Sequence, residues 1–472
     1  MADNGQQGAS RDWDWASASE IADAVARGAT SAATIIDRTL GRIAERDGMF
    51  NSFTVVVAER ARERARVVDA AIAAGQPPGP LAGVPFAVKN LFDVAGLRTV
   101  AGSKINRDRT PASRDATLIE RLEAAGAVLV GTLNMGEYAY DFTGENIHDG
   151  PSRNPHDTAR MTGGSSGGSG SAVAAGLVPL SLGSDTNGSI RVPASLCGLF
   201  GLKPTYGRLS RARTFPFVSS LDHLGPLART TSDLARAYDA MQGHDPDDPI
   251  STERAIEATV PQLALGCDEL RIALAGGHFR RGASSDALAA VTRVAEGLQV
   301  DREIELPQAQ RARAAAYVIT TSEGASLHLN RLRRRPQDFD PAVRDRLLAG
   351  AMVPAALVDK AQKFRRWYRD EMLKVFTDVD AILAPATPCT APAIGQQTFV
   401  LDGTELPIRP NLGIYTQPIS FIGLPVVVIP IALGTLPIGV QVIAAPWREE
   451  VALRVAHTLE MRGIATAPRP NL

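Results

Sequence analysis

A run of glycines and serines at residues 162–171 constrains this sequence most, because it continues without a break into the small-residue segment 172–176 and the apolar stretch 177–182. A flexible linker of that composition would not be expected inside such a unit. A loop packed against the start of a helix, in contrast, needs glycine where backbones approach closely or where φ is positive. The segment therefore predicts a tight loop, a short helix and a buried strand. The N–H groups at the start of that helix favour negative charge.

The surroundings of this loop exclude two familiar motifs. Residues 163–167 match the G-x-S-x-G pattern of a nucleophile elbow, which requires a strand directly before it. The preceding residues, 152–160, are typical of a polar turn instead, so the elbow and the α/β-hydrolase fold are excluded. A phosphate-binding loop is excluded as well, because no Gly-Lys-Ser/Thr follows the glycines.

A second turn rich in small polar residues, 183–194, follows the predicted strand 177–182. Successive backbone N–H groups in such a turn can form an oxyanion hole, and the Ser189 hydroxyl would stand beside it. The alternative is an ordinary turn at the end of a strand, which this block alone does not exclude.

Lys89 ends an apolar segment, 84–88, that we interpret as another buried strand. A lysine at the end of a strand is usually exposed to solvent. If it is held among apolar groups, desolvation disfavours its charged form and lowers its pKa. A neutral lysine can then accept a proton and serve as a general base.

Short apolar runs alternate with helical segments over most of the chain. Apolar residues at helical spacing occur at 20–27, 32–46, 59–74, 116–125, 231–241 and 449–461, and strands are expected at 84–88, 128–131, 177–182, 271–274, 381–383 and within 425–444. This alternation predicts an α/β fold with one large, twisted, mixed sheet, mainly parallel, covered by helices on both faces. We expect a single domain over 1–472, made of N-terminal helices (1–75), a core (81–245), a mainly helical insertion (250–375), and a C-terminal part of the sheet with a final helix (376–472).

Composition narrows the range of partners and compartments. Lys and Arg number 50 against 51 Asp and Glu, for a formal net charge of −1, which argues against nucleic acid as a partner. The three cysteines, Cys197, Cys267 and Cys389, show no spacing typical of a disulfide framework or a zinc site. Residues 1–15 lack the features of a signal peptide, and no apolar run is long enough to cross a membrane. We therefore expect a cytoplasmic protein that has no disulfide framework or zinc site and does not associate with membranes.

Lys89, the glycine-serine loop and the block 185–194 resemble the amidase signature family in order and spacing, and the similarity extends from about residue 17 to the C-terminus. The resemblance implies the amidase-signature fold and hydrolysis of amide C–N bonds without a cofactor. It implies a relay in which Ser189 is the acylated nucleophile, Ser165 the bridging group, preceded by a cis peptide bond, and Lys89 the base. The residues that it assigns to the oxyanion hole are Thr186, Asn187, Gly188 and Ser189, and those that it assigns a supporting role are Ser166, Asp185 and Arg191.

The chain departs from the family pattern at Asn187, where glycine is usual. Asparagine tolerates a positive φ better than other non-glycine residues, so the turn can be kept, and its amide could contact the substrate. With its neighbours in 185–193, this variant resembles the branch of the family that acts on 1-carboxybiuret in s-triazine (cyanuric acid) catabolism. That branch implies an amidohydrolase that releases ammonia from a small carboxylated urea-type substrate, 1-carboxybiuret or a biuret-like molecule.

The alternatives are a general small-molecule amidase and the glutaminase A subunit of an Asp-tRNA/Glu-tRNA amidotransferase, which residues 202–211 and 219–222 resemble. That subunit holds the ammonium group of glutamine with an aspartate near a C-terminal Thr-x-Pro, where this chain has Gly413. Tyr317 aligns with a substrate-binding tyrosine of related enzymes, and Arg331, or alternatively Arg333, is a candidate to receive a substrate carboxylate. The resemblance also implies a small helical accessory subunit, similar to the amidotransferase C subunit, or a homodimer.

Overall fold

The computed structural model describes residues 12–471, so most of the segment searched for a signal peptide lies outside the described residues. The strands of its main sheet are β1 (Phe53–Val56), β2 (Pro85–Lys89), β3 (Val128–Leu133), β6 (Leu180–Asp185), β7 (Phe200–Lys203), β8 (His223–Ala228), β9 (Ile272–Ala275), β10 (Glu303–Ile304), β11 (Ala381–Pro385), β14 (Val426–Ala432) and β15 (Pro437–Ala444). Two hairpins lie apart from it: β4 (Arg153–Asn154) with β5 (Asp157–Met161), and β12 (Thr398–Leu401) with β13 (Thr404–Pro407). The α-helices are α1 (Ala18–Ala26), α2 (Ala32–Phe50), α3 (Ala58–Ala73), α4 (Thr117–Ala124), α5 (Gly167–Ala174), α6 (Arg191–Cys197), α7 (Thr231–Met241), α8 (Ser285–Leu298), α9 (Ala309–Arg334), α10 (Pro341–Ala351), α11 (Ala355–Asp378), α12 (Ile408–Asn411), α13 (Gln417–Ser420) and α14 (Glu449–Met461).

The main sheet has 11 strands in the order β1-β3-β2-β6-β8-β7-β14-β15-β11-β9-β10. Four of its ten pairings are parallel and six are antiparallel. The sheet is therefore mixed, as predicted, but the prediction that it is mainly parallel is wrong. Parallel pairing is confined to β3-β2-β6 and β11-β9-β10, where helical crossovers return the chain to the same edge. The centre of the sheet instead contains the tight β14–β15 hairpin and strands that reverse direction.

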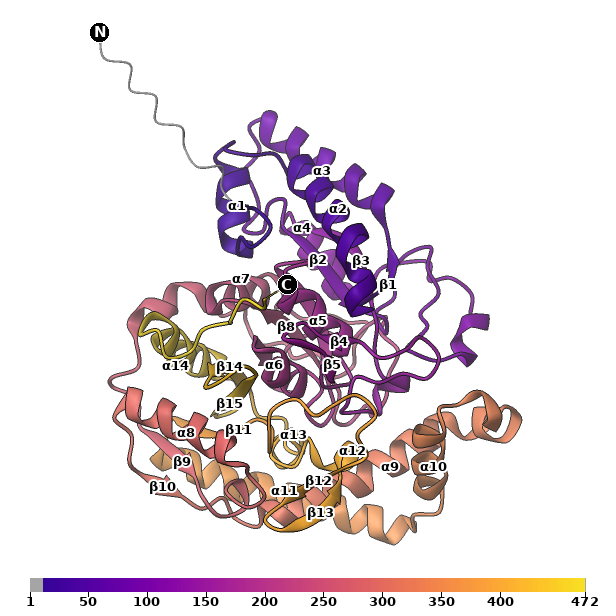
Figure 1. The fold of residues 1–472 in the computed structure, drawn as a ribbon, viewed down its shortest axis with the longest axis vertical. Helices are drawn as coiled ribbons and strands as arrows, with labels where there is room; N and C mark the ends of the chain where they lie inside the picture. Colours follow the sequence, from indigo (N-terminus) through magenta and orange to yellow (C-terminus); the bar gives the residue numbers. More distant parts are fainter. Residues whose placement is uncertain (1–11, 472) are drawn as a thin grey trace.

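Helices cover both faces of the sheet, as predicted. β2, β6, β8 and β15 are buried along their whole length, which requires cover on each side. α5 and α6 pack against each other and against the sheet, and α7 and α14 form another such pair. α9, α10 and α11 pack together at the lower end of the molecule in Figure 1.

Local signals in the sequence locate several helices. The side chain of Ser17 caps α1 in a capping box with Glu20, and Ser31 caps α2, as expected for these residue types. α7 and α14 begin and end at the predicted residues. The stretch predicted as mainly helical also contains β10, which pairs in parallel with β9 and extends the edge of the sheet. β10 has only two residues, too few for a sequence pattern that would predict a strand.

The register of β2 and β6 brings Lys89 close to the second polar turn. These strands are parallel neighbours with Val88 opposite Leu182, so Lys89 at the end of β2 lies beside the end of β6. β6 begins three residues later than predicted and includes Asp185. The second polar turn therefore starts at Thr186.

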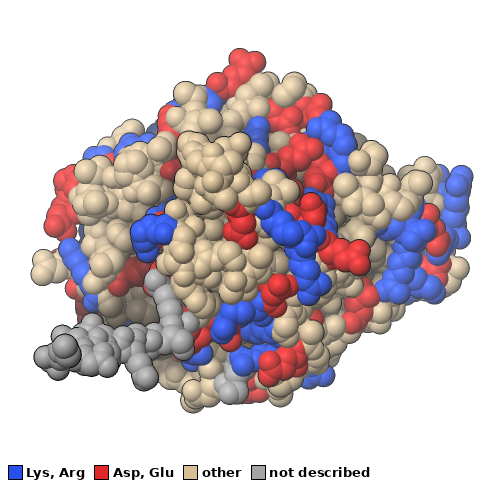
Figure 2. All heavy atoms as spheres, turned by 90° about the horizontal axis from the view of Figure 1, so that it is seen from above, with Lys and Arg blue, Asp and Glu red and all other residues tan. Residues whose placement is uncertain are grey.

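Charged side chains of both signs are interspersed over the face drawn in Figure 2. Within the described range, no helix is long and apolar enough to cross a membrane. In the same range, no group of three or more His, Cys, Asp or Glu side chains is placed to hold a metal ion.

Candidate active site

Lys89 is fully buried, and its amino group contacts hydroxyls rather than a carboxylate. Nζ donates to Ser165 Oγ at 2.6 Å, to Ser184 Oγ at 2.9 Å and to Ser166 Oγ at 3.0 Å. Burial lowers the pKa of Lys89 to about 7, an effect that more distant carboxylates only partly oppose. Near neutral pH this amino group is available to accept a proton.

The glycine-serine loop reaches Lys89 through closely packed backbone. The peptide bond between Gly164 and Ser165 is cis, as the family resemblance implies. The loop leads directly into α5, and Ser166 is the N-cap residue of that helix. The Ser166 hydroxyl donates to the carbonyl oxygen of Ser184 at 3.2 Å instead of accepting from the helix N–H groups. The loop and helix predicted from the sequence are confirmed, and the serine pair is directed at the lysine.

The turn after β6 presents four successive backbone N–H groups, those of residues 186–189, and none of them donates to another residue within 12–471. Gly188 carries the positive φ of this turn (143°), whereas Asn187 does not adopt one. The tolerance of asparagine for positive φ is therefore not what preserves the turn. Thr416 Oγ1 donates to the backbone oxygen of Asn187 at 2.6 Å and supports the turn from the C-terminal part of the chain. Unpaired, preorganised N–H groups are what an oxyanion hole requires.

A fully buried ion pair supports the same turn. Arg191 Nε and Nη2 lie 2.9 Å and 3.0 Å from the two carboxylate oxygens of Asp185. Burial alone would raise the pKa of Asp185, but the Arg191 guanidinium outweighs it and holds that pKa well below its usual range. Arg191 also donates to the carbonyl oxygen of Thr416 at 3.1 Å and to Gln441 Oε1 at 2.8 Å. The supporting position predicted for Asp185 and Arg191 agrees with these contacts.

Ser189 is buried at the end of the turn, one residue before the amide of Ile190, which donates to Asp185 Oδ2 at 3.2 Å. Its hydroxyl forms no hydrogen bond with any residue in the described range, and Ser165 is not bonded to it there. The serine hydroxyl is therefore free to turn toward an incoming group, as is common for catalytic contacts that tighten only with substrate.

A cavity of about 600 Å³ adjoins this arrangement. Its wall includes Ser184, which contacts Lys89, and Thr186, whose hydroxyl donates to Asp222 Oδ1 at 2.6 Å. Lys89, Ser165 and Ser189 are not in its wall. The cavity thus reaches the site from the side of the turn that Thr186 occupies.

The two predicted substrate-binding residues of α9 fall in different places. Tyr317 is 40% exposed and neighbours Tyr140, whose pKa is raised by burial and further by the Tyr317 phenol. Thr320, one turn along the same face, accepts from Asn187 Nδ2 at 2.9 Å, so this part of α9 meets the turn. Arg331 lies about 16 Å further along the helix and packs over the Phe215 ring, 5.5 Å from its centroid. No contact joins Arg331 to the turn within the described residues, and its role in binding a carboxylate stays a prediction.

Four side chains that bond to Lys89 or to the turn 186–189 were not predicted. Ser184 lies in the second polar turn, Asp222 lies in a block that resembles the amidotransferase subunit, Thr320 lies on α9, and Thr416 begins the Thr-x-Pro tripeptide. Their residue types gave no separate signal, because serine, threonine and aspartate are common in turns. Their contacts depend on strands and loops far apart in the sequence.

This fold, with a buried lysine bonded to the serine pair of a glycine-rich loop at the end of β2, is that of a class of hydrolases that act on linear amides. The chain belongs to the amidase signature family, whose model, described as Amidase, matches residues 34–453.

Relatives and solved structures agree with this assignment. The chain is 55% identical to AtzE, a subunit of the 1-carboxybiuret hydrolase of Pseudomonas sp. (strain ADP), over 94% of this chain and 98% of that protein. It is 40% identical to the A subunit of the glutamyl-tRNA(Gln) amidotransferase of Azotobacter vinelandii, over 93% and 95% of the two chains. A structure described as a vestigial protein complex that reveals the evolutionary origins of an s-triazine catabolic enzyme matches with a TM-score of 0.95 and 54% identity, over 96% of this chain and 100% of that one.

Proposed function

We propose that this amidase hydrolyses a small, carboxylated urea-type substrate, 1-carboxybiuret or a biuret-like molecule, and releases ammonia through an acyl-Ser189 intermediate. The observation that carries the mechanism is the 2.6 Å hydrogen bond from a buried, weakly basic Lys89 to Ser165. A lysine with a pKa of about 7 is about half neutral near pH 7, and the neutral form can take a proton through a serine hydroxyl without first losing its own.

The proposed steps balance as follows. Ser189 Oγ attacks the carbonyl carbon, while its proton passes to Ser165 Oγ and the Ser165 proton passes to Lys89 Nζ. The N–H groups of 186–189 stabilise the negative charge on the carbonyl oxygen. The C–N bond then breaks, the proton returns by the same path to the departing nitrogen, and ammonia leaves. Water then attacks the acyl carbon, while its proton passes through Ser165 Oγ to Lys89 Nζ. The C–O bond to Ser189 breaks, the proton returns through Ser165 to Ser189 Oγ, and the carboxylic acid product leaves.

The substrate class is supported by the relatives and by the surroundings of Gly413. The 55% identity to the 1-carboxybiuret hydrolase chain exceeds the 40% identity to the amidotransferase chain. A Cβ at Gly413 would lie 2.7 Å from Cε2 and 2.9 Å from Cε1 of Phe142. The position where the amidotransferase holds an ammonium group with aspartate is therefore filled by an aromatic ring, which disfavours an α-amino-acid substrate.

Arg313 replaces Arg331 as our candidate to receive the substrate carboxylate. It lies one turn before Tyr317 on the same face of α9 and donates to Gln417 Oε1 at 2.8 Å and Asn411 Oδ1 at 2.7 Å. No carboxylate pairs with it within residues 12–471. A partly buried arginine with only neutral acceptors retains its attraction for an anionic ligand.

We further propose that this chain binds a small helical accessory subunit, with a homodimer as the alternative. The description of the similar structure as a protein complex supports the first of these. Light scattering of the purified chain, alone and after co-expression with a small neighbouring gene product, distinguishes them by mass.

Ammonia release from 1-carboxybiuret, biuret, allophanate and glutamine tests the proposed function. We expect turnover of the first two and loss of it by about 10³-fold or more in Ser189→Ala. Ser169→Ala is the matched control, because Ser169 Oγ donates to the carbonyl oxygen of Leu182 within the same loop-helix unit and has no role in the relay. Release from glutamine alone would overturn the substrate class and leave the mechanism intact.

A further inference from the structure

The side-chain amide of Asn187 has a hydrogen-bond partner at its nitrogen but, among the described residues, none at its oxygen. It is 7% exposed, and its Nδ2 donates to Thr320 Oγ1 at 2.9 Å. Its Oδ1 is buried without a hydrogen-bond partner anywhere in the described range. Buried acceptors are nearly always paired in native proteins, so an orphaned one beside an active site needs an explanation.

Two hydrogen bonds fix the position of Asn187, one at its side-chain amide and one at its backbone carbonyl. Thr320 on α9 binds its nitrogen, and Thr416 donates to its backbone oxygen at 2.6 Å. The free oxygen therefore belongs to a rigid group, next in sequence to Gly188 and Ser189. The turn then offers backbone donors for an oxyanion and, from the same segment, one neutral acceptor for a donor on the substrate.

A urea-type carbonyl differs from a plain carboxamide on the side that does not leave. When ammonia departs from biuret, the acyl group on Ser189 still carries an N–H beside its carbonyl carbon. A plain carboxamide has a carbon in that place and would leave Oδ1 unpaired. Sites built to bind a polar hydrogen discriminate strongly against analogues that lack it, because the buried partner is then unsatisfied.

We propose that Asn187 Oδ1 accepts a hydrogen bond from the retained N–H of a urea-type substrate and so selects ureas over carboxamides. This inference rests on the proposed function and specifies which atom recognises its substrate class. Asparagine suits this task better than aspartate, because a carboxylate there would oppose the negative charge that develops on the carbonyl oxygen.

Biuret and malonamide test the proposal, since they differ only in a central N–H or CH2. We expect Asn187→Gly to lower the ratio of kcat/KM for biuret to that for malonamide by about 10- to 100-fold. Differences in intrinsic reactivity between the two compounds cancel, because the wild type and the variant are compared with the same pair. An unchanged ratio overturns the inference. If the wild type hydrolyses neither biuret nor 1-carboxybiuret, the proposed function itself fails.

A second pair of variants keeps the test independent of how well Asn187→Gly folds. Thr320→Val removes the group that orients the amide and should lower the same ratio, while Thr320→Ser should restore it. Thr321→Val is the matched control, because Thr321 Oγ1 bonds only to backbone oxygens of its own helix within the described residues. Equal ratios in Thr320→Val and Thr321→Val would also overturn the inference.

Discussion

Lys89 and Lys203 occupy similar positions in two regions of the sheet. Each is the last residue of a strand, β2 or β7, and each is fully buried. Burial lowers the pKa of both to about 7. Lys89 donates to three serine hydroxyls next to the open turn, whereas Lys203 donates to the carbonyl oxygen of Pro204 at 2.9 Å and, within 12–471, to nothing else.

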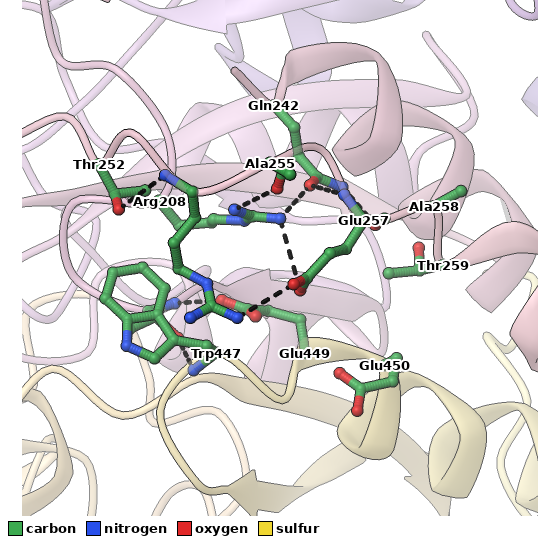
Figure 3. A network of polar contacts seen from close by, with 12 residues as sticks. Arg208, Gln242, Thr252, Ala255, Glu257, Ala258, Thr259, Trp447, Glu449 and Glu450 are labelled. Carbon is green, nitrogen blue, oxygen red and sulfur yellow. Dashed lines mark hydrogen bonds and ion pairs between the residues drawn. The ribbon is translucent and has the colours of Figure 1, made fainter. Parts of the chain in front are cut away.

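The region beyond Lys203 is a network in which polar groups satisfy one another. Glu449 Oε1 accepts from the Thr205 amide at 2.7 Å, and Arg254 pairs with Glu257 at 3.0 Å. Figure 3 shows Glu257, Trp447 and Glu449 within this network. Arg254 also stacks over the Trp447 ring, 5.3 Å from its centroid. A lowered lysine pKa thus occurs in both regions and does not by itself identify a base. What distinguishes the Lys89 region is a cluster of three serine hydroxyls around the amino group, beside a turn with unpaired N–H groups.

Replacing each lysine with methionine tests this comparison with the largest expected effect. Lys89→Met removes the proposed base, so we expect kcat to fall about 10³-fold. Lys203→Met removes a lysine of the same burial, and we expect kcat to stay within about threefold of the wild type. Ammonia release at saturating substrate measures both, and urea unfolding confirms that each variant folds. A similar loss in the two variants would show that burial of a lysine, not its hydroxyl contacts, is what matters.

The pH dependence of activity gives the next largest effect. Protonation of Lys89 removes the proton acceptor, so kcat/KM should fall by up to about tenfold per pH unit below pH 7. The Lys203→Met variant should keep this profile. Initial rates between about pH 5.5 and 8.5 measure it, and a displaced profile in Lys203→Met would contradict the assignment of the titration to Lys89.

Stability should depend on pH through both lysines. Their folded pKa of about 7 lies below the usual 10.5, so between these values the unfolded chain binds protons that the folded chain does not. The free energy of unfolding should therefore rise with pH in this window, by at most about 1.4 kcal/mol per pH unit for each lysine. Lys203→Met should remove one of the two contributions. Urea unfolding at several pH values measures the slope, and an unchanged slope would show that Lys203 keeps its proton in the folded chain over this window.

Glu449→Gln should produce the smallest change. Glu449 raises the pKa of Lys203 against the larger effect of burial, and glutamine keeps an oxygen that can accept from the Thr205 amide. We expect the rising part of the stability profile to begin at lower pH, with kcat unaltered. Unfolding near pH 6 and 7 detects this shift, and any loss of kcat would link the two regions that we consider separate.

Much of the local structure and the contact between Lys89 and Ser165 could be predicted from the sequence. Helix caps such as Ser17 and Ser31 act on neighbouring residues, so their effect is visible within one turn of chain. Lys89, Ser165 and Ser189 stand in motifs whose spacing is shared by the family. The hydrogen bond between the first two was expected on that basis and is present at 2.6 Å.

Features that depend on distant segments could not be predicted. Thr416 reaches the oxygen of Asn187 across 229 residues and Thr320 reaches its amide across 133, and no local pattern encodes either distance. Arg331 was chosen from a basic run, and no local pattern indicates that Arg313, earlier on the same helix, bonds to Gln417 and Asn411. The direction of strand pairing was missed for the same reason, since periodicity reports burial and not the direction of a neighbour.

The packing of Phe142 against Gly413 has a consequence for how this enzyme could change its specificity. Introducing aspartate at 413 requires space that the ring of Phe142 occupies, and overpacking of this kind typically costs about 1–3 kcal/mol. Removing the ring alone would leave a cavity without supplying the acid. A change to amino-acid substrates would therefore need both substitutions together, and each intermediate along a single-step path would be less stable without any new activity. Directed evolution toward a glutaminase should start from the double variant.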